Sequence, residues 1–226
     1  SGSTRLLLVT VSLLAIGAVK LAAEARPEGE AGPAAEALAR HMLAAVFDPA
    51  WQATGAGRWT FRGTREHRWD RRRSVARGGW DDVEVFIDLT TRRSVVLSKG
   101  REVVGKRREK LAEKAYAYWI NDSFWLNPVT KIFDQGTERS VVELEDGGQA
   151  LLVTYSSGGL TPGDAYLWIL DDAGLPTMWK MWVSSLPVGG TKATWEEWIR
   201  HDTGALVSTR HTLSLANEKM DAVEGA

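Results

Sequence analysis

Hydrophobic and polar positions change their spacing several times along this chain. Residues 34–47 are rich in alanine and leucine and place their apolar side chains on one face, which predicts a helix. Over residues 59–97 apolar and polar positions alternate, and the regular alternation over 83–89 is typical of a half-buried strand. Residues 106–122 return to a helical spacing, and after Pro128 the alternation resumes. The pattern therefore predicts helix, strands, helix and a second run of strands.

The second half of the chain is predicted to be a series of short antiparallel strands. Loops rich in glycine, aspartate and serine separate them, as in hairpins. The expected strands cover residues 141–145, 151–155, 165–170, 177–184, 193–201 and 206–215. Helices grouped against one face of an antiparallel sheet give the α+β class. A twisted sheet of about ten strands has to curl, so the predicted fold is an incomplete β-barrel whose concave side is covered by helices.

The first 25 residues have the pattern of a secretory signal peptide. Arg5 precedes fourteen uncharged, mostly apolar residues, and Ala23-Glu24-Ala25 follows as a small-x-small cleavage site. The apolar run is shorter than the roughly 20 residues that span a bilayer. An uncleaved anchor or a buried helix is the alternative, and Ser1-Gly2-Ser3 is interpreted as a cloning remnant. We expect a bacterial protein exported to the periplasm or secreted, with residues 26–226 as one domain and no stable membrane insertion after cleavage.

The charge balance and the absence of cysteine argue against some classes of binding partner and exclude some kinds of chemistry. Without residues 1–25 the chain has 26 basic and 28 acidic residues, a balance that argues against a nucleic-acid partner. The arginine- and tryptophan-rich residues 51–75 are interpreted as a strand pair with arginines on its solvent face. The chain has no cysteine, which excludes disulfides, thiolate catalysis and thiolate metal sites.

The remaining titratable residues do not form a recognisable catalytic or metal-binding motif. His67 and Asp70 are three residues apart, so on a strand they would point to opposite faces. The four histidines lack metal-ligand spacing, and the acidic loops do not match a calcium-binding loop. We therefore expect a protein that is not an enzyme and has no cofactor and no metal. A hydrolase with an unrecognised site around His67, Asp70 or His201 is a less favoured alternative.

Eleven tryptophans are the second distinctive feature of the chain. Several predicted strands carry large apolar side chains on both faces. One face is expected to pack on the helices, while the other lines a cavity, contacts a partner or simply thickens the core. The residues expected to line an apolar ligand cavity are Trp59, Phe61, Trp69, Val85, Ile87, Trp168, Trp179 and Met181.

The order of elements and three short motifs resemble the outer-membrane lipoprotein carrier (LolA-like) superfamily. The motifs are Asn-Asp-Ser-Phe-Trp-Leu at 121–126, Tyr-Leu-Trp-Ile-Leu-Asp at 166–171 and Leu-Pro-Thr-Met-Trp at 175–179, which are similar to bacterial envelope proteins in that superfamily. The resemblance covers most of residues 35–215. It implies an unclosed antiparallel barrel with helices over a hydrophobic cavity, and no catalytic residues.

Two functions follow as the main expectations. The first is a periplasmic, non-catalytic carrier or binding protein for a lipid, a lipoprotein acyl chain or another hydrophobic molecule. Burial of acyl chains in a dry cavity gains about 0.8 kcal/mol per CH₂. The second is a cell-envelope interaction module that uses exposed aromatic strands to bind a protein or a glycan. Partner proteins of the envelope are compatible with both.

Overall fold

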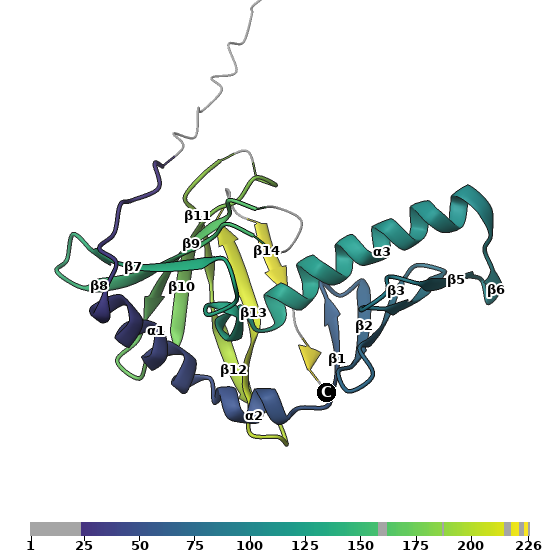
Figure 1. The fold of residues 1–226 in the computed structure, drawn as a ribbon, viewed down its shortest axis with the longest axis horizontal. Coiled ribbons are helices and arrows are strands. Elements are labelled where there is room, and N and C mark those ends of the chain that lie inside the picture. The colour runs from purple at the N-terminus through teal and green to yellow at the C-terminus, as the bar shows by residue number, and fades with distance from the viewer. Residues whose placement is uncertain (1–23, 158–161, 187, 215–217, 222–223, 226) are drawn as a thin grey trace, which may run out of the picture.

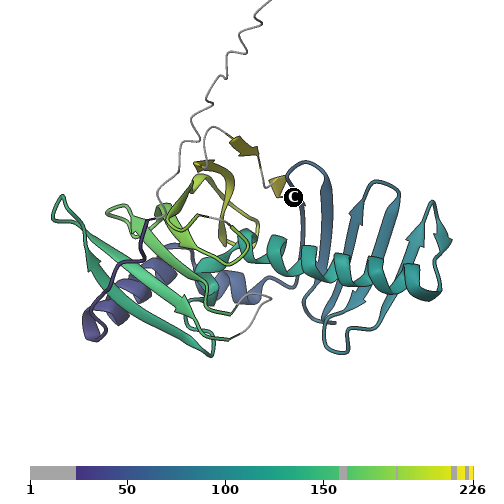
Figure 2. The same ribbon diagram turned by 90° about the horizontal axis from the view of Figure 1, so that it is seen from above.

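The computed structural model describes residues 24–226 apart from 158–161, 187, 215–217, 222–223 and 226. All but the last two residues of the expected signal segment lie outside this part of the chain. The described residues form two antiparallel sheets that stand side by side, with one long helix running from the first to the second (Figures 1 and 2). Among the described helices, none is long and apolar enough to cross a membrane.

The N-terminal sheet is a meander of short hairpins. Its strands are β1 (Ala56–Phe61), β2 (Arg65–Asp70), β3 (Val75–Trp80), β4 (Val83–Asp88), β5 (Ser94–Ser98) and β6 (Arg101–Glu102), and β15 (Glu224–Gly225) pairs with β1. Each strand is hydrogen-bonded to the next in the sequence. Apolar and polar residues alternate along these strands, so Trp59, Val85 and Ile87 lie on the face that α3 covers. The other face carries charged residues.

The long helix α3 (Gly105–Leu126) connects the two sheets. It lies along one face of the N-terminal sheet and its last turn is packed in the core of the C-terminal sheet (Figure 2). The start of α3 carries Lys106, Arg107 and Arg108 at the positive end of the helix dipole, which is unfavourable. Arg107 donates to Ser98 Oγ at 3.3 Å, and Arg108 donates to the carbonyl oxygen of Ser94 at 3.0 Å. These two guanidinium groups therefore reach to β5.

The C-terminal sheet is formed by the second run of strands. The short 3-10 helix η1 (Pro128–Lys131) leads to β7 (Thr137–Glu143), β8 (Gln149–Tyr155), β9 (Ala165–Leu170), β10 (Pro176–Trp182), β11 (Thr191–Thr194), β12 (Glu196–Arg200), β13 (Leu206–Ser214) and β14 (Glu218–Asp221). The order is β12-β13-β11-β10-β9-β8-β7, with β14 beside β13. The single strand predicted over 193–201 is two strands, β11 and β12, which are interrupted at Trp195 and pair with different parts of β13.

Helices α1 (Pro33–Ala45) and α2 (Asp48–Ala53) precede both sheets, and α1 lies across the C-terminal sheet (Figure 1). We call the face toward α1 and the end of α3 the inner face of this sheet. Both faces of β8, β9 and β10 are apolar, as the sequence predicted. Leu151, Trp168 and Trp179 are buried on the inner face, and Leu152 and Leu167 belong to a separate cluster on the other face.

The α+β class and the curved antiparallel architecture covered by helices are confirmed. The strands are divided between two sheets, where the sequence predicted one sheet of about ten strands. The physical reason is α3, whose buried residues pack against β3, β4 and β5 and whose last turn reaches the other core. The two meanders are therefore joined through a shared helix and not through continuous strand pairing.

Candidate functional site

A dense group of rings occupies the inner face of the C-terminal sheet. The alternation of β8, β9 and β10 directs rings to this face from consecutive strands, and the last turn of α3 adds two more from the opposite side. We call this group the aromatic cluster; its members are Phe124, Trp125, Tyr155, Tyr166, Trp168, Trp179, Trp195 and His211. Its position depends on both the strand register and the C-terminal end of α3.

Trp179 is the centre of the aromatic cluster. Its ring centroid lies 4.6 Å from that of Tyr166, 4.7 Å from Trp168, 4.8 Å from Trp125 and 4.9 Å from Trp195. Most of these pairs are edge-to-face or tilted, the arrangements that the ring quadrupoles favour. Trp168 and Trp179 are directly opposite each other on β9 and β10. The cluster is thus built by cross-strand pairing, and the helices close over it.

Several polar atoms of the aromatic cluster are buried without a hydrogen bond to any described residue. They are the indole Nε1 atoms of Trp168, Trp179 and Trp195, the hydroxyl of Tyr155 and Nε2 of His211. A buried polar group without a partner costs roughly 1–3 kcal/mol, and such groups are uncommon in native structures. Five of them in one cluster therefore need a physical explanation.

His211 provides a hydrogen-bond acceptor beside the indole N–H donors of the aromatic cluster. Its Nδ1 lies 3.0 Å from the carbonyl oxygen of Thr194, and because a carbonyl oxygen only accepts, Nδ1 carries the hydrogen. Burial lowers the pKa of His211 to about 4, so the ring is neutral at pH 7 and Nε2 has a free lone pair. Burial also raises the pKa of Tyr155 above its usual range, which keeps its hydroxyl protonated. The cluster therefore presents three N–H donors, one acceptor and one hydroxyl.

Helix α1 covers the inner face of the C-terminal sheet. Ala35, Ala39 and Met42 on its inward side are completely buried, and Ala39 and Met42 belong to the core that contains the aromatic cluster. Arg139 on β7 donates to Glu36 at 2.7 Å, in a pair whose side chains are 16% and 35% exposed. No side chain caps the N-terminus of α1. Apolar packing, which includes Met42, and one partly exposed ion pair therefore hold this cover in place.

The eight residues predicted to line a cavity lie in three separate clusters. Phe61, Trp168, Trp179 and Met181 lie together in the core under α1. The others pack with α3 on the N-terminal sheet: Trp59 and Trp69 surround Trp119, and Val85 and Ile87 contact the middle of the helix. Every predicted residue except the half-buried Trp69 is at most 3% exposed. The described residues therefore do not line one common chamber, because α3 covers the N-terminal sheet.

A buried ionic cluster, which sequence reasoning missed, links β2 to α3. Asp122 is fully buried and accepts hydrogen bonds from Arg65 Nε at 2.8 Å and from its terminal nitrogen at 2.7 Å. His67 Nε2 lies 2.6 Å from the same carboxylate, and Asn121 donates to it at 2.8 Å. We call Arg65, His67 and Asp122 the ionic clamp. The only signal for it was that Asp122 lies on the apolar stripe of α3.

The ionic clamp does not support the hydrolase alternative. His67 is 2% exposed and stacks on Trp59, with ring centroids 5.0 Å apart. Asp70 lies on the opposite face of β2, where it binds Arg73, so the expected separation of His67 and Asp70 agrees with the strand geometry. In the described part of the chain, no group of three or more histidine or acidic side chains is arranged to hold a metal ion.

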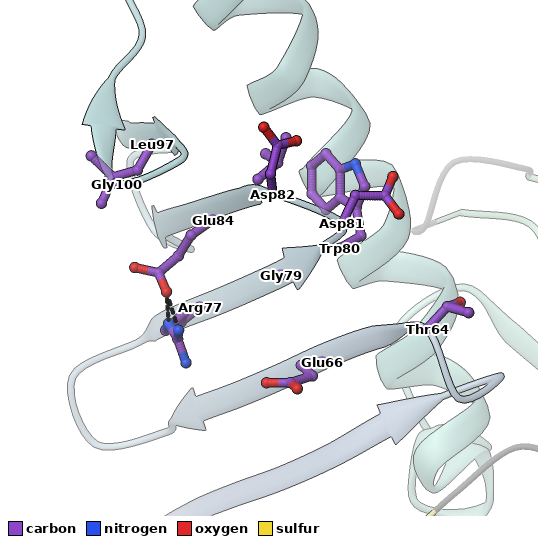
Figure 3. Close-up of a pocket in the computed structure, with 11 residues that line it drawn as sticks. Thr64, Glu66, Arg77, Gly79, Trp80, Asp81, Asp82, Glu84, Leu97 and Gly100 are labelled. Carbon is purple, nitrogen blue, oxygen red and sulfur yellow. Dashed lines mark hydrogen bonds and ion pairs between the residues drawn. The ribbon is translucent and has the colours of Figure 1, made fainter.

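Two surface cavities lie on the solvent face of the N-terminal sheet. The first, of about 410 Å³, is bordered by Glu66, Asp81 and Asp82 and by the Arg77–Glu84 ion pair (Figure 3). The second, of about 540 Å³, lies on the same face nearer to β1 and β2. Both are on the side of the sheet opposite α3 and are separate from the aromatic cluster.

Comparison with known proteins gives one likeness. No protein-family model matches the chain, and no curated protein matches it in sequence. Among solved structures, the chain is similar to the crystal structure of a DUF1329 family protein from Desulfovibrio piger ATCC 29098. The two chains are 9% identical with a TM-score of 0.41, and the alignment covers 85% of this chain and 91% of the other. A likeness at this level assigns neither a family nor a ligand.

Proposed function

We propose that this protein is a non-catalytic carrier or binding protein for a lipid, an acyl chain or another hydrophobic molecule. The ligand would lie between the inner face of the C-terminal sheet and α1, within the aromatic cluster. The single observation that carries the proposal is the set of five buried polar atoms without protein partners. The sequence resemblance to lipoprotein carriers and the expected signal peptide support the same function and an envelope location.

The chemistry of the aromatic cluster suits an acyl ligand that has polar groups at one end. Rings supply dispersion contacts to methylene groups, and each buried CH₂ gains about 0.8 kcal/mol. Ester or amide carbonyl oxygens would accept hydrogen bonds from the indole N–H groups of Trp168, Trp179 and Trp195. A ligand hydroxyl would donate to Nε2 of His211. Binding would thus give these groups hydrogen-bond partners that the described residues do not supply.

Entry of the ligand requires the cover to move. The rings fill the closed core, so we expect α1 to be displaced from the sheet when the ligand binds. The buried residues on its inward face are two alanines and Met42, with Leu38 and Leu43 packed beside them, and the Glu36–Arg139 pair is partly exposed. Partly exposed ion pairs contribute little to stability. The energetic barrier to displacement of α1 is therefore set mainly by apolar burial, which an acyl ligand would replace.

The rival glycan- or protein-binding module depends on exposed aromatic strands, and the structure gives it little support. All eleven tryptophans are in the described residues, and each is buried or half-buried. The exposed large hydrophobic side chains are Phe47, Phe86, Val95, Val104, Phe133 and Ile199. Phe86 and Val95 are directly opposite each other on β4 and β5, but none of these exposed side chains is a tryptophan, so the described strands form no tryptophan platform for sugar rings.

Trp168→Phe and Trp195→Phe are expected to reduce ligand retention more than stability. Each change removes an unpartnered N–H donor and part of a ring, which costs about 1–2 kcal/mol of packing. Trp80→Phe is the matched control, because Trp80 is buried in the N-terminal sheet away from the cluster. Lipid that copurifies would be counted by native mass spectrometry, and stability measured by urea denaturation. Equal lipid content in the cluster variants and the wild type would contradict the proposal.

A further inference from the structure

Three arginines form a row across the solvent face of the N-terminal sheet. Arg58, Arg68 and Arg77 are directly opposite one another on β1, β2 and β3, and Phe86 continues the row on β4. Directly opposite side chains have Cβ atoms about 5 Å apart, and like charges in such pairs are destabilising. The strand pairing therefore places three guanidinium groups close together, although their positive charges repel one another.

Only one of these three arginines is neutralised by a neighbour. Arg77 forms an ion pair with Glu84 on β4 (Figure 3). Arg58 and Arg68 are exposed, and neither makes an ion pair or a side-chain hydrogen bond with any described residue. The nearby carboxylates do not compensate them. Asp70 binds the backbone and side chain of Arg73.

The other acidic residues of this face border the first cavity or bind the backbone of their own turn. Glu66 is opposite Thr60 and Gly79 in the register, and it borders the other, acidic cavity together with Asp81 and Asp82 (Figure 3). Asp88 accepts hydrogen bonds from the backbone of Thr90 and Thr91 in its own turn. Among the described residues, therefore, no carboxylate pairs with Arg58 or Arg68.

The second surface cavity lies beside these two arginines. It has a volume of about 540 Å³, within the usual size of small-molecule sites, and the residues around it include Arg58, Arg68, Asp70, Val75, Arg77 and Phe86. Phe86 is 38% exposed and its ring lies under the Arg77 guanidinium, 6.0 Å from the centroid. The cavity is therefore bordered by arginines and by an apolar surface, and the carboxylate at its border, Asp70, is paired with Arg73.

We propose that this cavity binds an oxyanion, such as a phosphate, sulfonate or carboxylate group, that is carried on an apolar molecule. The anionic group bridges Arg58 and Arg68, whose planar guanidinium groups suit paired oxygen atoms. Its charge removes the repulsion along the arginine row. The apolar part of the molecule lies on Val75 and Phe86. This site is independent of the aromatic cluster, because it is on another sheet and on the face opposite α3.

The test is calorimetric titration with octyl phosphate below its micellar concentration. The Arg58→Gln/Arg68→Gln variant is expected to bind about tenfold or more weakly than the wild type, since it loses hydrogen bonds to a charged group. Arg62→Gln/Arg93→Gln is the control, because it removes the same charge from exposed turns of the same sheet. Octanol should bind much more weakly than octyl phosphate to the wild type. Circular dichroism checks that both variants fold.

Two further probes identify the source of the oxyanion. Inorganic phosphate alone reports whether the arginines suffice without an apolar part. Vesicles of phosphatidylglycerol, with phosphatidylcholine vesicles as the neutral control, report whether the site takes a lipid headgroup from a bilayer. Undetectable binding of octyl phosphate to the wild type at millimolar concentration would overturn the proposal. An equal loss in the Arg62/Arg93 control would also overturn it, because binding would then reflect net charge.

Discussion

Asp122→Ala is expected to lower the free energy of unfolding by about 3–5 kcal/mol, because it removes one partner from a buried ion pair. Asp122 is fully buried and is bound by Arg65 and His67. Arg65 is only 17% exposed and stacks on Phe61 and Tyr118, so its charge has little access to water once the carboxylate is lost. Urea denaturation monitored by tryptophan fluorescence measures the change.

Two further variants separate the ionic clamp from general damage to α3. Glu113→Ala removes an exposed carboxylate from the same helix and should change stability by less than about 0.5 kcal/mol. The triple change Arg65→Met, His67→Phe and Asp122→Leu replaces all three polar groups by apolar ones. It should be more stable than Asp122→Ala, because no unpaired charge remains. A loss below about 1 kcal/mol for Asp122→Ala would show that the clamp contributes little.

Acidification is expected to destabilise the protein through His211. The pKa of this histidine is about 4 in the folded protein and about 6.5 when it is unfolded. Between these values the unfolded chain binds a proton that the folded chain does not, so the free energy of unfolding falls as the pH falls. The full contribution of His211 is present above pH 6.5 and is lost by about pH 4, and it amounts to about 3 kcal/mol.

His211→Asn tests this pH dependence directly. The asparagine side chain does not titrate and retains a donor for the carbonyl oxygen of Thr194. We expect this variant to lose most of the slope of stability against pH between 6.5 and 4. His41→Gln is the matched control, because His41 is exposed, and its slope should equal that of the wild type. An unchanged slope in His211→Asn would mean that other groups dominate acid unfolding.

The strand faces could be predicted from the sequence because side-chain direction in a strand depends only on parity. Trp59, Phe61, Val85, Trp168 and Trp179 all lie on buried faces, as the alternation predicted. Parity does not say which helix covers a face. Which helix covers a face is decided by tertiary packing, in which α3 packs on β3, β4 and β5 and α1 packs on β7 and β8. The structure places these residues in three clusters under two different helices, an arrangement that parity alone could not predict.

The ionic clamp illustrates a second limit of sequence reasoning. Asp122 shares a helical stripe with Leu111 and Ala115, and a carboxylate at an apolar position indicates a buried partner. Nothing in the local sequence identifies that partner, because Arg65 and His67 lie more than fifty residues earlier. Export by a signal peptide stays a prediction, since residues 1–23 lie outside the described part of the chain.

The most direct test of ligand binding is native mass spectrometry of the protein exported from bacteria with its own N-terminal segment and purified without detergent. We expect a complex with about one lipid or other hydrophobic molecule per chain, which organic extraction would release for identification. After incubation of the extracted protein with lipid vesicles, the bound mass should return. A mass equal to the polypeptide alone, both after purification and after exposure to lipid, would contradict the proposed function.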